Sequence, residues 1–135
     1  MSDMTVDQAL AVAQDTKRSS QDREAAMRGL ENKASDQTIS GMIKLLSDGD
    51  AGVRWTASTT LISFGDAALV PMLQALVDQH DSTWLREGAY RIFHDTKSIK
   101  VRNATGDVVK ALKGPASETA TTDAAAQALL KIYNI

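Results

Sequence analysis

Two His-Asp dipeptides are the residues of this sequence whose types are best suited to chemistry. His80-Asp81 and His94-Asp95 each join an imidazole to a carboxylate, and these side chains bind divalent metal ions. A metal site needs three or more ligands that converge on one point. The two dipeptides lie 14 residues apart, which is not the spacing of a repeat that would bring them together. We therefore predict two surface histidines and no metal site.

Other catalytic motifs are absent from the sequence. Without cysteine, the chain has no thiolate nucleophile, no thiolate zinc site and no disulfide. Asp48-Gly49-Asp50 begins like a calcium-binding loop, but Gly52 and Thr59 stand where that loop needs ligands. No glycine-rich phosphate loop and no serine nucleophile elbow occurs. We therefore predict that the protein is not an enzyme and uses no cofactor.

The composition indicates a helical protein of one domain. Hydrophobic residues make up 43% of the 135 residues, aromatic residues make up 4%, and only two residues are proline. This balance favours helices over strands. No apolar run is long enough to span a membrane, and acidic residues stand near the N-terminus where a secretory signal would be basic. We expect a cytoplasmic protein without a membrane partner.

Basic residues gather in the stretch 94–113. This stretch holds two acidic residues and five basic ones, which are Lys97, Lys100, Arg102, Lys110 and Lys113. The whole chain carries a net charge of −2, whereas nucleic-acid-binding proteins usually have a clear basic excess. We interpret the stretch as a solvated loop and helix face, and we keep nucleic-acid binding as an alternative function.

An internal repeat determines the predicted architecture. Four segments share an anchor residue, a small residue three positions later and a large apolar residue seven positions later. These spacings place all three residues on one face of a helix. The anchors lie 31, 32 and 37 residues apart. The four sets are Arg23, Ala26 and Leu30; Arg54, Ala57 and Leu61; Arg86, Ala89 and Phe93; and Asp123, Ala126 and Leu130.

A second apolar stripe precedes each anchor and has the period of an amphipathic helix. The clearest stripes run from Ile39 to Leu46 and from Leu69 to Leu76. Each repeat is therefore predicted to be a hairpin of a first helix, A, and a second helix, B. Hairpins of this kind must stack to bury their apolar faces, which predicts an all-α solenoid of about four hairpins. It forms a single domain over residues 1–135, with approximate repeats 5–34, 37–65, 66–95 and 104–134 and an insertion at 94–103.

The arginine that recurs near the start of the B helices is interpreted as structural. Aspartates of the preceding turn could pair with it in a ladder of partly exposed ion pairs. The predicted pairs join Arg54 to Asp48, to Asp50 or to an aspartate of a neighbouring repeat, and Arg86 to Asp78 or Asp81.

The pattern resembles HEAT-like repeats, especially the short bacterial kind named after phycobilisome lyases. In that kind, an apolar helix and an acidic turn are followed by Val-Arg, Ala and Leu on the B helix and then by Gly. The residues that match best are Leu46, Asp48, Asp50, Val53, Arg54, Ala57, Leu61 and Gly65. The resemblance implies a scaffold or adaptor that binds another protein. It also leaves open an accessory subunit of a tetrapyrrole (phycobilin) lyase as an alternative.

In this architecture the B helices line the concave face. Residues one, four, five and eight positions after each anchor point away from the positions that face the core. We predict that a partner protein binds there through an apolar centre with a charged rim. The predicted surface consists of Met27, Arg28, Trp55, Ile62, Tyr90, Arg91 and His94. Packing of Trp55 and Ile62 between adjacent B helices is the alternative for those two residues.

Overall fold

The computed structural model describes residues 4–115 and 117–133, and every regular element in these ranges is helical. The α-helices are α1 (Val6–Gln14), α2 (Ser20–Arg28), α3 (Asp36–Leu45), α4 (Ala51–Ser63), α5 (Leu69–Asp78), α6 (Thr83–Asp95), α7 (Ile99–Ala104), α8 (Gly106–Lys113) and α9 (Ser117–Tyr133). A short 3-10 helix, η1 (Gly65–Ala68), joins α4 to α5. The all-α prediction is confirmed, while residues 1–3, 116 and 134–135 of the predicted domain lie outside the described residues.

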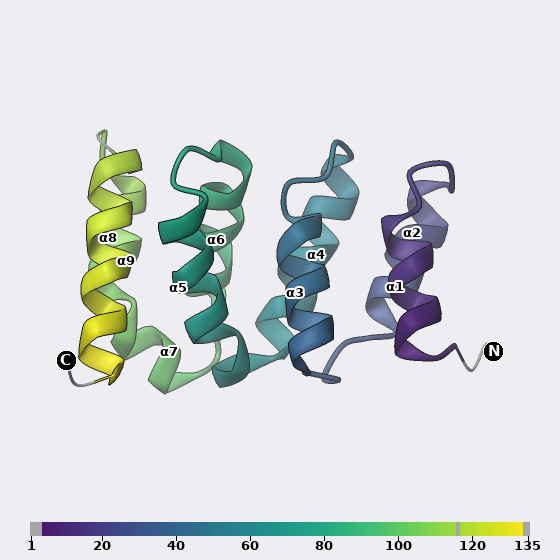
Figure 1. Ribbon diagram of the computed structural model, residues 1–135, viewed down its shortest axis with the longest axis horizontal. Helices are drawn as coiled ribbons and strands as arrows, with labels where there is room; N and C mark the ends of the chain where they lie inside the picture. The colour runs from purple at the N-terminus through teal and green to yellow at the C-terminus, as the bar shows by residue number, and fades with distance from the viewer. Residues whose placement is uncertain (1–3, 116, 134–135) are drawn as a thin grey trace.

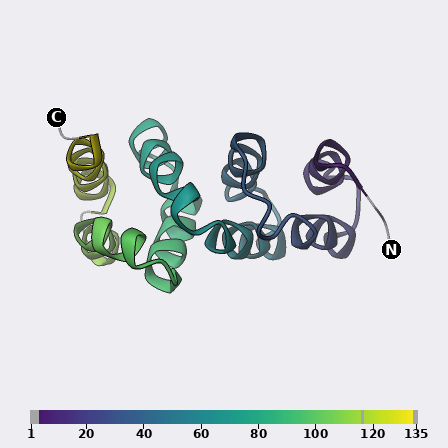
Figure 2. The ribbon, with the colours of Figure 1, turned by 90° about the horizontal axis from the view of Figure 1, so that it is seen from below.

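The helices form hairpins that stand side by side along the long axis of the molecule (Figure 1). Seen along the hairpins, they form two rows (Figure 2). One row, here called the A row, contains α1, α3, α5 and α9, and the other, the B row, contains α2, α4, α6 and α8. This arrangement is an α-solenoid, as the repeat pattern predicts.

The two rows are not equally close-packed. In the first three hairpins, α2 packs extensively on α4 and α4 on α6, whereas α1, α3 and α5 contact one another less. Small buried residues on the B helices, such as Ala57 and Ala89, allow close approach. Since helices that approach more closely on one side bend a stack toward that side, the B row is the inner side of these hairpins.

The apolar stripes of the sequence form one continuous core between the rows. Ile39, Met42 and Leu46 of the second hairpin are buried, as are Leu69, Met72, Leu73 and Leu76 of the third. Complete burial of a side chain of this size stabilises the fold by about 1.5–3 kcal/mol relative to exposure. Since each stripe is covered by both its own hairpin and a neighbour, the hairpins depend on one another for stability.

The last hairpin differs from the prediction. Its first helix, α8, packs on α6 in the B row, and its second helix, α9, packs on α5 in the A row. The prediction that Asp123 marks a fourth B helix is therefore wrong, because Asp123 lies on α9. The segment 94–103, interpreted as an insertion, explains why the first helix of this hairpin lies in the B row and the second in the A row. Val101-Arg102, followed by Thr105 and Val109, repeats the B-helix spacing and begins a second B-type segment directly after α6.

Three arginines of the repeat bind backbone carbonyl groups rather than aspartates. Arg54 donates to the carbonyl of Asp48 at 2.7 Å, Arg86 to that of His80 at 2.5 Å, and Arg102 to that of Thr96 at 2.7 Å. Each acceptor lies six residues before its arginine, in the turn that precedes the helix. Turn carbonyls at this position lack a helical partner, so a guanidinium that reaches back satisfies them.

The predicted ladder of ion pairs is accordingly wrong for Arg54 and Arg86. Neither guanidinium pairs with its predicted carboxylates, those of Asp48 and Asp50 or of Asp78 and Asp81. Asp78 instead accepts a hydrogen bond from Gln74 at 3.0 Å.

One arginine does form a buried ion pair between neighbouring hairpins. Arg23 of α2 donates two hydrogen bonds to the Asp48 carboxylate, at 2.5 and 3.2 Å, and a third to the Ala13 carbonyl at 2.8 Å. The side chains of Arg23 and Asp48 are only 5% and 11% exposed. The pair therefore fixes the first hairpin against the turn of the second.

The substitution Arg23→Met tests this link. It leaves the Asp48 carboxylate without its cation, and the loss of one partner from a buried ion pair costs about 3 kcal/mol of unfolding free energy. Urea denaturation would measure this cost. Arg18→Met is the matched control, because Arg18 forms an exposed pair with Asp15 at 3.5 Å and its loss costs about 0.5 kcal/mol. Equal destabilisation by the two substitutions would contradict the structural role of Arg23.

Candidate functional site

A hollow of about 260 Å³ lies on the B row between the N-terminal halves of α4 and α6. Its walls include two tryptophans, two arginines and one glutamate, namely Trp55, Trp84, Arg54, Arg91 and Glu87. Gly88 also lines the hollow, and a Cβ at this position would come within 3.0 Å of the Leu46 side chain at the boundary of the core. The hollow thus combines aromatic surface with opposite charges.

Trp55 is a surface residue, and it is held in place by Arg91. The Trp55 side chain is 62% exposed, and the Arg91 guanidinium carbon lies 3.4 Å from the centroid of the indole ring. Arg91 also donates to the Trp55 carbonyl at 3.1 Å, to the Thr59 hydroxyl at 2.9 Å and to the Ser58 hydroxyl. A cation over an indole attracts its π electrons, so these contacts attach α6 to α4 and fix the Trp55 ring at the surface.

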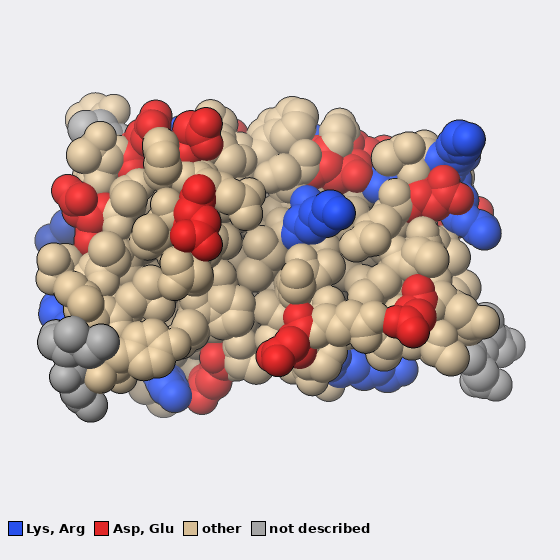
Figure 3. Space-filling model, in the orientation of Figure 1, with Lys and Arg blue, Asp and Glu red and all other residues tan. Residues whose placement is uncertain are grey.

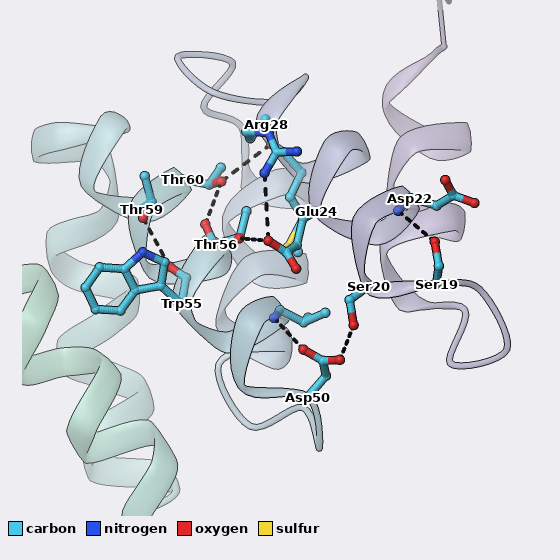
Figure 4. A network of polar contacts seen from close by, with 12 residues as sticks. Ser19, Ser20, Asp22, Glu24, Arg28, Asp50, Trp55, Thr56, Thr59 and Thr60 are labelled. Atoms are coloured by element: carbon cyan, nitrogen blue, oxygen red, sulfur yellow. Dashed lines mark hydrogen bonds and ion pairs between the residues drawn. The ribbon is translucent and has the colours of Figure 1, made fainter.

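Packing between adjacent B helices was the alternative for Trp55 and Ile62, and only Ile62 fits it in part. Ile62 is partly buried and packs against the core, whereas Trp55 points away from α2 in the close-up view (Figure 4). The surface therefore keeps Trp55 as its apolar centre, with Ile62 at its edge.

Trp84 is a residue of this surface that sequence reasoning missed. It lies in the first turn of α6, is 42% exposed, and carries the Arg54 guanidinium 4.1 Å from its ring centroid. The signal was present in the sequence, because Trp84 precedes Arg91 by seven positions and so shares its helix face.

Tyr90 and His94 extend the surface along α6. Their rings stack with centroids 5.3 Å apart, and Nδ1 of His94 lies 2.8 Å from Oδ1 of Asp95. The other histidine, His80, lies elsewhere and contacts the Glu118 carboxylate at 3.3 Å. Across the ranges 4–115 and 117–133, no three His, Asp or Glu side chains are grouped so that they could hold a metal ion.

The first hairpin contributes little to the predicted surface. Met27 is completely buried, so its assignment as a partner-binding residue is wrong. At the fourth position after the anchor, Met27 and the equivalent Ser58 of α4 are buried and the equivalent Tyr90 of α6 is half-buried, so this position points at least partly toward a neighbouring B helix. Arg28 is exposed but lies 3.8 Å from the Glu24 carboxylate, which also accepts a hydrogen bond from Thr56 (Figure 4).

Arg91 is the most perturbed charge of the site. Burial lowers the pKa of its guanidinium from the ordinary value, and the nearby Asp95 carboxylate partly opposes that shift. Its Nε atom is buried without a hydrogen-bond partner and lies 3.7 Å from Oδ2 of Asp95. Arg91 therefore carries a charge that is poorly solvated on its inner side and incompletely paired.

Asp50 fixes the start of the helix that carries Trp55. Its carboxylate accepts hydrogen bonds from the Ser20 hydroxyl of α2 and, at 3.0 Å, from the Val53 backbone N–H of α4 (Figure 4). The Ser20 contact is the main reason that the pKa of Asp50 lies below its ordinary value, and the Val53 contact adds to the effect. Asp50 thus caps α4 and joins it to the first hairpin.

Stacked helical hairpins that expose an ordered surface on one row define the class of this protein, an α-solenoid. The chain matches the family model for HEAT repeats over residues 6–93, and it belongs to the HEAT repeat family. HEAT repeats commonly mediate protein–protein interaction, and HEAT repeat proteins are generally non-catalytic scaffolds. Searches of curated proteins and of solved structures found no match. Within the described ranges, no helix is both long and apolar enough to cross a bilayer.

The ionisation of Asp50 gives a test of how α4 is held. A group with a lowered pKa in the folded state stabilises the fold above its unfolded pKa, and this stabilisation is lost as the pH falls through the folded pKa. Asp50→Asn keeps a capping side chain but removes the charge. We expect it to lower the melting temperature at neutral pH, and we expect its difference from the wild type to shrink as the pH falls through the lowered folded-state pKa of Asp50.

Thermal melts followed by circular dichroism would measure this difference across the pH range. Asp123→Asn is the control for the loss of one exposed carboxylate, since Asp123 is exposed on α9. A deficit for Asp50→Asn that persists unchanged at acid pH would contradict a role for the Asp50 charge.

Proposed function

We propose that this chain is a non-catalytic interaction module that binds another protein on the B-row surface around Trp55. The surface, as now defined, consists of the hollow residues Trp55, Trp84, Arg54 and Arg91, extended along α6 by His94 and the half-buried Tyr90, with the partly buried Ile62 two turns beyond Trp55 on α4. Membership of the HEAT repeat family supports the general role. The position of the surface on the inner row supports the choice of this face.

The observation that carries the proposal is an exposed tryptophan that is already ordered. Trp55 is 62% exposed, yet Arg91 lies over its ring and donates to its carbonyl. A large apolar side chain in water contributes nothing to the core, and an ordered one loses little conformational entropy when a partner covers it. Residues with these properties are typical anchors of protein interfaces.

The alternative functions have less support from the described residues. The basic residues of the stretch 94–113 are exposed but are spread over α7, α8 and the loop after α6, and Arg102 is engaged with the Thr96 carbonyl. The tetrapyrrole-lyase alternative rests on the resemblance to one kind of repeat. The surface around Trp55 therefore gives the better-supported function.

The proposal predicts that Trp55→Ala removes most of the affinity for the native partner. A native-organism lysate would be passed over the immobilised wild type and over Trp55→Ala, and bound proteins would be quantified by mass spectrometry. Because the loss of an interface anchor costs about 2 kcal/mol or more, we expect at least a roughly thirtyfold weaker affinity for the recovered partner.

Tyr133→Ala is the matched control, because Tyr133 is an aromatic residue that is 59% exposed on α9 in the A row. We expect its partner recovery to equal that of the wild type. Circular dichroism would verify that both variants fold. Undiminished recovery of every partner by a folded Trp55→Ala would contradict the proposed surface.

A further inference from the structure

We propose that the hollow between α4 and α6 binds a carboxylate side chain from an acidic segment of the partner protein, held by Arg54 and Arg91. This inference rests on the proposed function and gives the chemical class of the partner at that surface. The two guanidinium groups lie on opposite helices and both line the hollow. A carboxylate that enters between the helices would therefore meet donors from both sides.

Both arginines retain donor groups that could bind an anion. Arg54 makes its described hydrogen bond through Nη1, to the Asp48 carbonyl, and Arg91 makes all of its described hydrogen bonds through Nη1. The guanidinium carbon of Arg54 lies 4.1 Å from the ring centroid of Trp84, and that of Arg91 lies 3.4 Å from the ring centroid of Trp55. The Nη2 donors of both arginines make no described hydrogen bond in the hollow, and guanidinium N–H groups match the two oxygens of a carboxylate.

The surroundings of Arg91 favour an added negative charge. Its side chain is only 19% exposed; among the described residues its Nε has no hydrogen-bond partner, and Asp95, at 3.7 Å, is its one acidic neighbour within ion-pair range. A carboxylate from a partner would replace hydration that Arg91 has lost through burial. It would also bind close to the apolar edge of Trp55, which the proposed function already places in the interface.

The size and the charge of the hollow limit its occupant. Its volume of about 260 Å³ lies below the range of typical small-molecule pockets, about 300–1,000 Å³, and suits one side chain of a larger partner. Two arginines and one glutamate give the lining a net positive charge, although the whole chain has a net charge of −2. The opposite, A-row face in Figure 3 has carboxylates spread across it, so it offers an acidic segment no comparable site.

Glu87 allows a test in which one substitution should raise the affinity for the partner while others lower it. Its carboxylate lines the same hollow and forms no ion pair with either arginine within 4.0 Å. It would repel an incoming carboxylate, so Glu87→Gln should strengthen binding, whereas Arg54→Gln and Arg91→Gln should weaken it. A gain in affinity has the further value that misfolding cannot produce it.

The experiment selects binders from a phage-displayed library of random dodecapeptides on the immobilised full chain. We expect the enriched peptides to share an aspartate or glutamate. Their affinity, measured by fluorescence anisotropy, should fall at least tenfold with Arg91→Gln or Arg54→Gln and should rise with Glu87→Gln. Lys44→Gln is the control, because Lys44 is an exposed basic residue of the A-row helix α3, and it should leave the affinity unchanged.

A change in the peptide itself completes the test. Replacement of the shared acid by its amide should weaken binding to the wild type but should have little effect on binding to Arg91→Gln, since the two changes remove the same contact. Peptides that require Trp55 but need no acid would overturn this inference and leave the proposed function intact. Peptides that are unaffected by Trp55→Ala would contradict both, and a library that yields no binder would overturn this inference alone.

Discussion

The structure depends on one constraint, which is that no hairpin can bury its apolar face alone. Leu46, Leu61 and Leu73 become buried only because a neighbouring hairpin covers them. Close contact is needed for this, and small residues at Ala57 and Ala89 let the B helices approach the rest of the stack. Two aromatic rings, those of Phe64 and Phe93, are buried in this core, whereas Trp55 and Trp84 lie on the outside of the stack.

Polar contacts at the turns set how the hairpins are aligned. Ser19, Asp50, Ser82 and Ser98 each cap a B-type helix, and an arginine follows four positions later in every case. Three of these arginines hold the carbonyl of the preceding turn, and Arg23 holds both Ala13 and the Asp48 carboxylate of the next hairpin. The same alignment of α4 and α6 has an effect at the surface. It places the Arg54 guanidinium over Trp84 of α6 and the Arg91 guanidinium over Trp55 of α4. The contacts that order the stack thereby also order its surface.

The sequence was sufficient to predict the stacked hairpins. Helical spacing placed Leu61 on the core face, where it is buried, but left open whether Trp55, which the structure exposes, packs between B helices. It could not show that Met27 faces the adjacent B helix, because the crossing of two helices is not encoded in the period of either. It also missed the row exchange of α8 and α9, since Val101-Arg102 follows Arg86 by half the expected repeat length. The partner of Arg54 was mistaken because aspartates are visible in a sequence and free turn carbonyls are not.

The central claim is that Trp55 is an ordered surface residue, fixed by Arg91, and not part of the core between hairpins. Collisional quenching of Trp55 fluorescence by acrylamide tests it most directly, in the variant Trp84→Phe, where Trp55 is the only tryptophan and is excited selectively over tyrosine. The structure predicts red-shifted emission that acrylamide quenches readily in the free protein, because the side chain is 62% exposed. It also predicts slow rotation of the indole, because Arg91 holds the ring. Blue-shifted emission that is shielded from acrylamide in the free protein would place Trp55 in the core and contradict the account.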